Sequence, residues 1–83
     1  MKLNICCGKR LLPGYVNIDI AAVGGMPDIL APATHIPLPT GCATEIMCIH
    51  GWEHFYRWEC DDAIMEWRRL LRNGGRLVLE LPD

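Results

Sequence analysis

The segment from His50 to His54, HGWEH, has residue types and a spacing that can bind a metal. Its pattern H-x-x-E-H is that of inverted zinc proteases, in which two imidazoles hold the metal and the glutamate acts as general base. Such an enzyme also needs a third protein ligand and a substantial domain around the metal. Here the segment directly follows an apolar stretch, Gly51 disfavours the start of a helix, and few residues remain downstream. We therefore expect no metal at this segment.

The five cysteines are the other set of reactive side chains. An odd number, an adjacent pair and an N-terminus without the character of a secretory leader argue against a disulfide framework. There is no C-x-x-C motif, and the spacings of the cysteines and histidines in the middle of the chain include no ligand pair of the C-x₂₋₄-C kind. The sequence therefore predicts reduced, buried thiols and no metal; the residues considered are Cys6, Cys7, Cys42, Cys48, Cys60, His50 and His54.

Length and charge exclude several classes of protein. The 83 residues suffice for a single domain, residues 1–83, and the 51% of hydrophobic residues argue against disorder. A net charge of −2 provides no basic surface for nucleic acid, and no apolar run approaches the ~20 residues of a membrane span. We expect a cytoplasmic protein that has neither nucleic acid nor a membrane as a partner.

The elements that must position the reactive residues follow from hydrophobic patterns and turn residues. We expect five short strands, at residues 3–7, 15–20, 28–31, 45–49 and 76–81. One helix is expected over residues 61–72, started by Asp61 or Asp62 and ended by Gly74 and Gly75. Prolines between residues 32 and 39 exclude a helix there. A helix, a glycine pair and an apolar strand in succession indicate a β-α-β unit, and so an α/β fold with a mostly parallel sheet.

The order of these segments resembles one known family. KLNICCGKRLLPGYVNIDI, IPLPTGCATEI, HGWEHF and EWRRLLRNGGRLVLELPD are similar to successive motifs of the class I S-adenosylmethionine-dependent methyltransferases, and in particular of small members with an LNLGCG-type motif. The resemblance runs from Lys2 to Asp83. It implies a Rossmann-like fold that is incomplete, with about five strands where the family has seven.

The resemblance also implies a cofactor site for S-adenosylmethionine. The glycine turn after the first strand would hold the methionine part, and Asp19, at the end of the second strand, would bind the ribose hydroxyls. The chain has Cys6 where the family pattern has glycine, and Pro32 where the family often has an acid. The cofactor-binding residues that the resemblance implies are Asn4, Cys6, Cys7, Gly8, Asp19, Ile20 and Ala33.

The segment HGWEH has a different interpretation in this family. Glu53, His54 and Phe55 match its EHf motif, which lies beside the methyl acceptor. His50 or His54 can accept a proton from the acceptor, with Glu53 beside them, while an oxygen or nitrogen of the acceptor attacks the methyl group. Alternatively, Glu53 and His54 only hold the loop through hydrogen bonds to the backbone. Positioning alone can supply much of the rate of methyl transfer.

The last predicted strand has consequences for partners. Without further strands, residues 77–81 expose an apolar edge, so the chain is expected to be a fragment, a truncated product, or a protein that pairs this edge with another copy. The competing functional hypothesis is a non-catalytic remnant that acts as an interaction module.

Overall fold

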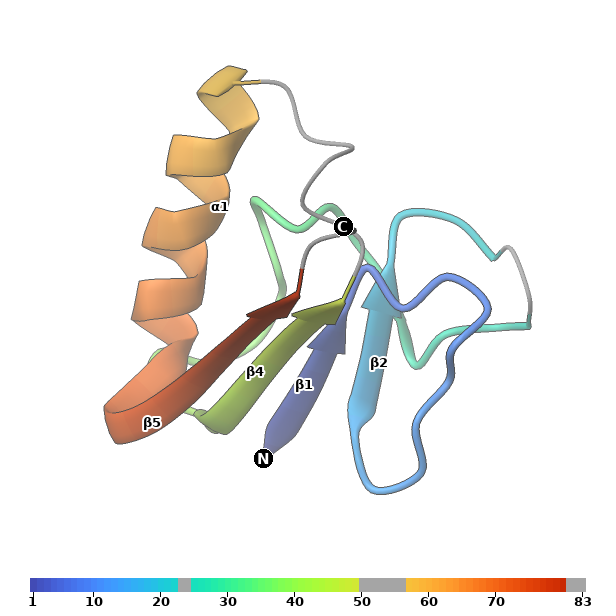
Figure 1. Cartoon of the computed structure of the whole chain (residues 1–83), viewed down its shortest axis with the longest axis horizontal. Coiled ribbons are helices and arrows are strands. Elements are labelled where there is room, and N and C mark those ends of the chain that lie inside the picture. The colour runs from blue at the N-terminus through green and yellow to red at the C-terminus, as the bar shows by residue number, and fades with distance from the viewer. Residues whose placement is uncertain (23–24, 50–56, 81–83) are drawn as a thin grey trace.

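The computed structural model describes residues 1–22, 25–49 and 57–80. In chain order the elements are β1 (Lys2–Ile5), β2 (Val16–Asp19), β3 (Ile29–Leu30), β4 (Ala43–Ile49), α1 (Arg57–Leu70) and β5 (Leu71–Glu80). The five strands form one parallel sheet in the order β3-β2-β1-β4-β5, and α1 lies along one of its faces (Figure 1). The strand order reverses between β1 and β4, as in Rossmann-like folds. The predicted α/β class with a parallel sheet is confirmed.

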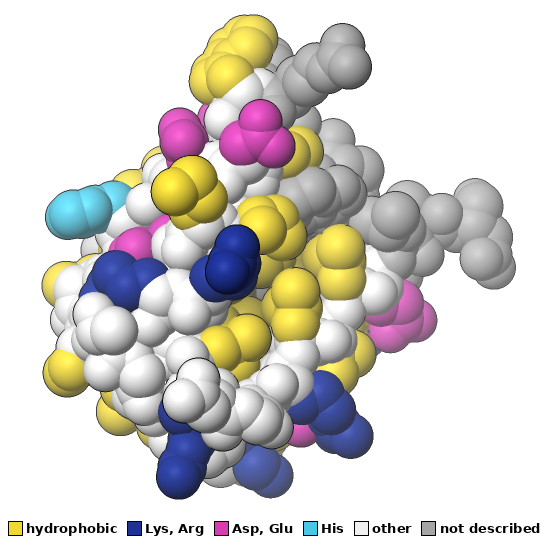
Figure 2. All heavy atoms as spheres, turned by 90° about the vertical axis from the view of Figure 1, so that its left-hand side faces the viewer, with side chains coloured by type: hydrophobic (Ala, Val, Ile, Leu, Met, Phe, Trp, Pro, Cys, Tyr) yellow, Lys and Arg dark blue, Asp and Glu magenta, His cyan; other side chains and the backbone are white. Residues whose placement is uncertain are grey.

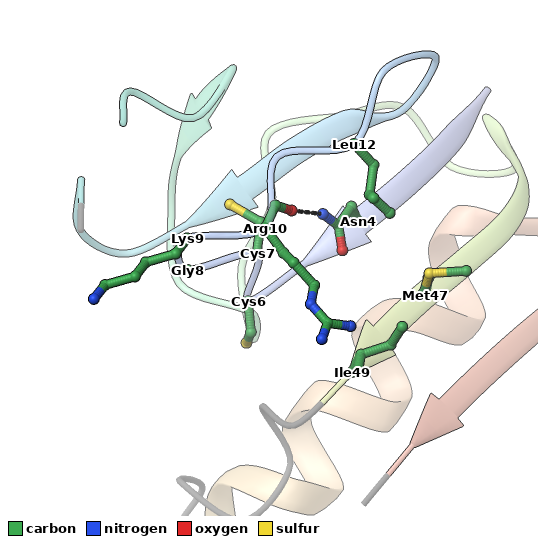
Figure 3. Close-up of a pocket in the computed structure, with 9 residues that line it drawn as sticks. All are labelled: Asn4, Cys6, Cys7, Gly8, Lys9, Arg10, Leu12, Met47 and Ile49. Carbon is green, nitrogen blue, oxygen red and sulfur yellow. Dashed lines mark hydrogen bonds between the residues drawn. The ribbon is translucent and has the colours of Figure 1, made fainter. Parts of the chain in front are cut away.

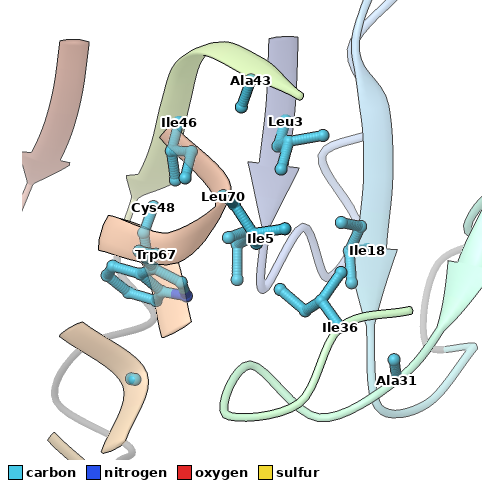
Figure 4. Close-up of a cluster of buried hydrophobic side chains, with 11 residues drawn as sticks. Leu3, Ile5, Ile18, Ala31, Ile36, Ala43, Ile46, Cys48, Trp67 and Leu70 are labelled. Carbon is cyan, nitrogen blue, oxygen red and sulfur yellow. The ribbon is translucent and has the colours of Figure 1, made fainter. Parts of the chain in front are cut away.

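The strand register sorts side chains between the two faces of the sheet. In parallel strands, paired residues point to the same face, and Leu3 pairs with Ile46 while Asn4 pairs with Met47. The apolar members face α1 and build the core with Trp67 and Leu70 of the helix (Figure 4). The opposite face bears polar and mixed residues, among them Asn4, Asn17, Glu45 and Met47.

Helix α1 presents one apolar stripe to the sheet. Ala63, Trp67 and Leu70 follow one another at helical spacing of four and three residues, and each is at most 1% exposed. The helix begins at Arg57 and not at Asp61 or Asp62, which are exposed within it. The predicted start was wrong because residues 57–60 contain no helix breaker, and Glu59 suits the positive end of the dipole. The helix also ends two residues earlier than predicted.

The connection between β3 and β4 contains the prolines and has no regular structure, as predicted. One ion pair on α1 fixes it to the helix. The Arg69 guanidinium donates to the carbonyl oxygens of Ile36 (3.0 Å) and Leu38 (2.9 Å), and also to Glu66. Glu66 in turn accepts a hydrogen bond from the Ile36 amide at 2.7 Å. This anchoring buries Ile36, which is 2% exposed, under the sheet.

The glycine pair lies inside β5, which is longer than predicted. Ala43 pairs with Leu71 and Glu45 with Arg76, so residues 72–75 of β5 bulge opposite a single residue of β4. Gly74 has a φ of +81°, and a Cβ at Gly75 would lie 2.9 Å from the Arg72 carbonyl oxygen. Both positions therefore favour glycine, and the pair allows the chain to pass from helix to strand without a loop.

Candidate functional site

The carboxyl ends of β1 and β4 border a hollow of about 430 Å³, on the face of the sheet opposite α1. Asn4, Met47 and Ile49 provide its strand residues, and the loop between β1 and β2 provides the rest (Figure 3). The lining residues are Asn4, Cys6, Cys7, Gly8, Lys9, Arg10, Leu12, Met47 and Ile49. This is the point where the strand order reverses, and open α/β sheets bind ligands there.

The β1–β2 loop turns sharply as it leaves the sheet. The strand ends at Ile5, two residues earlier than predicted, because Cys6 takes the left-handed conformation with a φ of +58°. Gly8 follows with a φ of +54°, and the Arg10 amide closes the turn on the Cys7 carbonyl oxygen at 2.8 Å. The left-handed backbone at Cys6 explains why glycine suits this position. A cysteine adopts this conformation at a cost of about 1–2 kcal/mol.

Asp19 joins the end of β2 to this turn. One carboxylate oxygen accepts a hydrogen bond from the Gly8 amide at 2.7 Å, and the other accepts from the Ile20 amide at 2.6 Å. Each carboxylate oxygen has two lone pairs, so both retain capacity for a hydroxyl donor. Ten residues separate Gly8 from Asp19 in the sequence. In the structure the glycine turn and this acid are in direct contact at the carboxyl ends of β1 and β2.

Asn4 has a structural task that the sequence did not reveal. Its amide nitrogen donates to the Arg10 carbonyl oxygen (2.7 Å) and to the Asn17 side chain (2.9 Å), so it holds the loop in place. Asn17 accepts from the Leu12 amide at 2.9 Å and donates to Asp28 at 3.2 Å. Asn4 is 3% and Asn17 8% exposed. The sequence contains one signal for this network, which is the amide side chain of Asn17 between Val16 and Ile18 in a predicted strand. A buried amide needs hydrogen-bond partners.

The two thiols of the turn are kept protonated. A hydrogen bond with the Cys48 side chain, together with burial, raises the pKa of the Cys6 thiol far above its ordinary value. Burial, and then the negative charge of Asp19, raises the pKa of Cys7. Figure 3 shows the Cys6 side chain pointing away from Arg10 and Asn4. Neither thiol has the depressed pKa of a nucleophile or a metal ligand.

Two cationic residues lie on the loop at the hollow. The Arg10 side chain extends from the loop toward Ile49, while Lys9 points outward (Figure 3). Within residues 1–22, 25–49 and 57–80, the Arg10 guanidinium has no carboxylate partner. The hollow therefore combines an apolar wall from Met47 and Ile49 with one positively charged group, a lining suited to an amphipathic anion or zwitterion.

The sequence-predicted site residues divide into three groups. Asn4, Cys6, Cys7 and Gly8 line the hollow, and Asp19 adjoins them through Gly8. Ile20 and Ala33 do not line it: Ile20 is 73% exposed, and the Ala33 carbonyl oxygen accepts a hydrogen bond from the Trp67 indole at 3.1 Å. His50, Glu53 and His54 lie outside the described residues, so their roles stay predictions.

A second polar cluster lies on the same face but near the start of β4. Glu45, 8% exposed, accepts hydrogen bonds from the Tyr15 hydroxyl and, at 2.7 Å, from Arg76. The hydrogen bond from Tyr15, and then that from Arg76, lowers the pKa of Glu45, while Glu45 raises the pKa of Tyr15. Lys2 lies over the Tyr15 ring, 5.6 Å from its centroid. Each member of this cluster has a partner, so we assign it no part in the chemistry of the hollow.

Metal ligands and membrane helices were also sought in the described ranges. There, His, Cys, Asp and Glu side chains form no group of three that could hold a metal ion. None of the helices in that part of the chain is long and apolar enough to cross a membrane.

Comparison with known proteins agrees with the geometry. A family model described as a methyltransferase domain matches residues 13–79, a range that includes Asp19, the strands β2, β3 and β4, and all of β5 but its last residue. No curated protein and no solved structure shows a significant match. The match covers most of the chain and coincides with the strand order and the Asp19 turn described above. The chain therefore belongs to the class I S-adenosylmethionine-dependent methyltransferase family.

Proposed function

We propose that this chain binds S-adenosylmethionine at the carboxyl ends of β1, β2 and β4 and transfers its methyl group to an oxygen or nitrogen of a small-molecule acceptor. One observation carries the proposal: the Gly8 amide bonds to the Asp19 carboxylate beside the hollow, at the point where the strand order reverses. The family shown by residues 13–79 typically uses this cofactor.

The described residues fit the ribose and the methionine part of the cofactor. Asp19, with free lone pairs on both oxygens, accepts the ribose hydroxyls. The left-handed turn at Cys6 and Gly8 brings backbone close to the methionine part, and the Arg10 guanidinium suits its carboxylate. Met47 and Ile49 exclude water from the apolar side.

The chemistry asks little of the protein beyond positioning. When bound, the cofactor supplies a methyl group already activated by the positive sulfonium. The protein aligns the acceptor and excludes water, which can account for much of the rate. In the proposed site His50 or His54, with Glu53, accepts the acceptor's proton or holds the loop that borders it.

A calorimetric titration with S-adenosylmethionine tests the binding step. We expect saturable binding to the intact chain and binding about 10–100-fold weaker to Asp19→Ala, since a hydrogen bond to a charged group is worth roughly 1.5–3 kcal/mol. Asp62→Ala, an exposed acid on α1, is the matched control and retains full affinity. Circular dichroism establishes that each variant is folded.

The outcomes separate the parts of the proposal. A folded intact chain that binds no cofactor overturns it, and equal affinity of Asp19→Ala removes Asp19 from the site. Release of S-adenosylhomocysteine in the presence of a panel of oxygen and nitrogen nucleophiles tests catalysis. Binding without any such release would favour the non-catalytic interaction module.

A further inference from the structure

The outer edge of β5 is the long free edge of the described sheet. The strand order places β3 and β5 at the two edges, but β3 has two residues while β5 has ten. Among the described residues no strand pairs with the side of β5 that faces away from β4. Alternate N–H and C=O groups along that side are therefore open to another strand, and residues 76–80 contain no proline or lysine to block one.

The sequence of this edge, RLVLE, is complementary to itself in the antiparallel direction. When two copies are aligned with Val78 opposite Val78, Arg76 lies opposite Glu80 of the other copy. The same alignment places Leu77 opposite Leu79. Opposite charges and apolar pairs directly across an antiparallel ladder each stabilise it, by roughly 0.2–1 kcal/mol.

The two faces of the sheet make this alignment consistent. Arg76 and Val78 pair with Glu45 and Met47 of β4, so they point to the open face, and Glu80 follows them at even spacing. The Arg76 side chain is 72% exposed and uses one nitrogen on Glu45, so its other donors can reach a second carboxylate.

On the opposite face, the leucines are left partly uncovered. Leu77 and Leu79 point toward the side of α1, and each remains 38% exposed. Nearby α1 carries Trp58 and Met65, which are 68% and 69% exposed. Figure 2 shows hydrophobic side chains gathered on this side of the molecule, beside the helix. A second copy aligned on Val78 would cover the leucines with its own.

We propose that two copies of this chain associate through β5, antiparallel and centred on Val78, to form one continuous sheet with both α1 helices on the same face. The two-fold axis then runs perpendicular to the sheet, and each dimer contains two Arg76–Glu80 pairs and two Leu77–Leu79 pairs. An interface of one strand pair is small, so we expect a dissociation constant of about 10–100 µM for the dimer. The proposal is independent of cofactor binding, which involves β1, β2 and β4.

Sedimentation of the full 83-residue chain over a range of concentrations tests the dimer. We expect the mass to rise from 9.4 kDa toward twice that value. Glu80→Arg places arginine opposite Arg76 twice per dimer and should weaken association about tenfold. Asp62→Arg makes the same charge change on an exposed position of α1 and leaves association unchanged.

The register has its own measurement. In a mixture of isotope-labelled and unlabelled copies, intermolecular nuclear Overhauser effects should join Leu77 of one copy to Leu79 of the other. A mass of 9.4 kDa at every concentration, with a folded amide spectrum, overturns the proposal. So does a dimer that Glu80→Arg leaves intact, or one without the Leu77–Leu79 contact.

Discussion

At the scale of single residues, two side chains beside the hollow have two tasks. The hydrogen bonds that they form stabilise the fold, and the same hydrogen bonds fix the shape of the site. Asn4 holds the β1–β2 loop through Arg10 and Asn17, and Asp19 holds the turn through Gly8. A variant that removes either side chain changes the shape of the site as well as its contacts. Arg10 differs from both, because its backbone is anchored while its guanidinium has no carboxylate partner in the described part of the chain.

Arg10→Gln therefore tests the charge of the site with little effect on its shape. Because the guanidinium would bind the cofactor's carboxylate, we expect Arg10→Gln to bind S-adenosylmethionine about tenfold more weakly. Decarboxylated S-adenosylmethionine is the matched ligand, and its affinity should be the same for both proteins. Titration calorimetry measures both ligands. An equal loss of affinity for both would show that Arg10 acts through the loop and does not contact the carboxylate.

At the scale of elements, the order of strands and helix could be predicted because hydrophobic spacing is a local property. The apolar runs before Gly8 and after Gly75 predicted β1 and β5, and the spacing of Trp67 and Leu70 predicted the helix. The network of Asn4, Asn17 and Asp28 was not predicted. Its hydrogen bonds join residues up to 13 positions apart, and single-residue propensities contain no such information.

The same limit applies to the pair that fastens the β3–β4 connection to α1. Glu66 and Arg69 lie within the predicted helix, and no contact to the connection was predicted for them, yet together they form hydrogen bonds with three of its backbone groups. The hydrogen bond from Arg69 lowers the pKa of Glu66 from its ordinary value near 4.5. The stability that this pair contributes is therefore fully present above that value, and it is lost as the pH falls through the lower pKa of the folded state.

We expect the thermal midpoint of the intact chain to fall as the pH drops below about 4.5. Glu66→Gln should lower the midpoint by about 5 °C at pH 7 and make its decline in acid less steep. Part of the decline remains, because the pKa of Glu45 is also lowered. Asp62→Asn, on an exposed position of the same helix, is the control. An acid decline as steep in Glu66→Gln as in the intact chain would contradict the role of this pair.

At the scale of the whole molecule, the single core on the α1 side limits stability. A domain of 83 residues buries only about 60–65% of the surface that its unfolded chain exposes. A domain of this size has a free energy of unfolding of only about 5–10 kcal/mol. A ligand that binds only the folded form therefore adds a large share of that free energy. At the proposed site the cofactor would also join β1, β2 and β4, and the loop between β1 and β2 is held in part by side-chain hydrogen bonds.

The cofactor should therefore raise the unfolding temperature strongly. At a concentration 100-fold above its dissociation constant, S-adenosylmethionine adds about 2.7 kcal/mol, which corresponds to roughly 10–20 °C for a domain of this size. At the same concentration, tenfold weaker binding to Asp19→Ala would reduce the added free energy, and so the shift, to about half. Differential scanning fluorimetry measures both, with methionine alone as the control ligand. An equal shift in the two proteins would mean that the ligand stabilises the chain at a site that does not include Asp19.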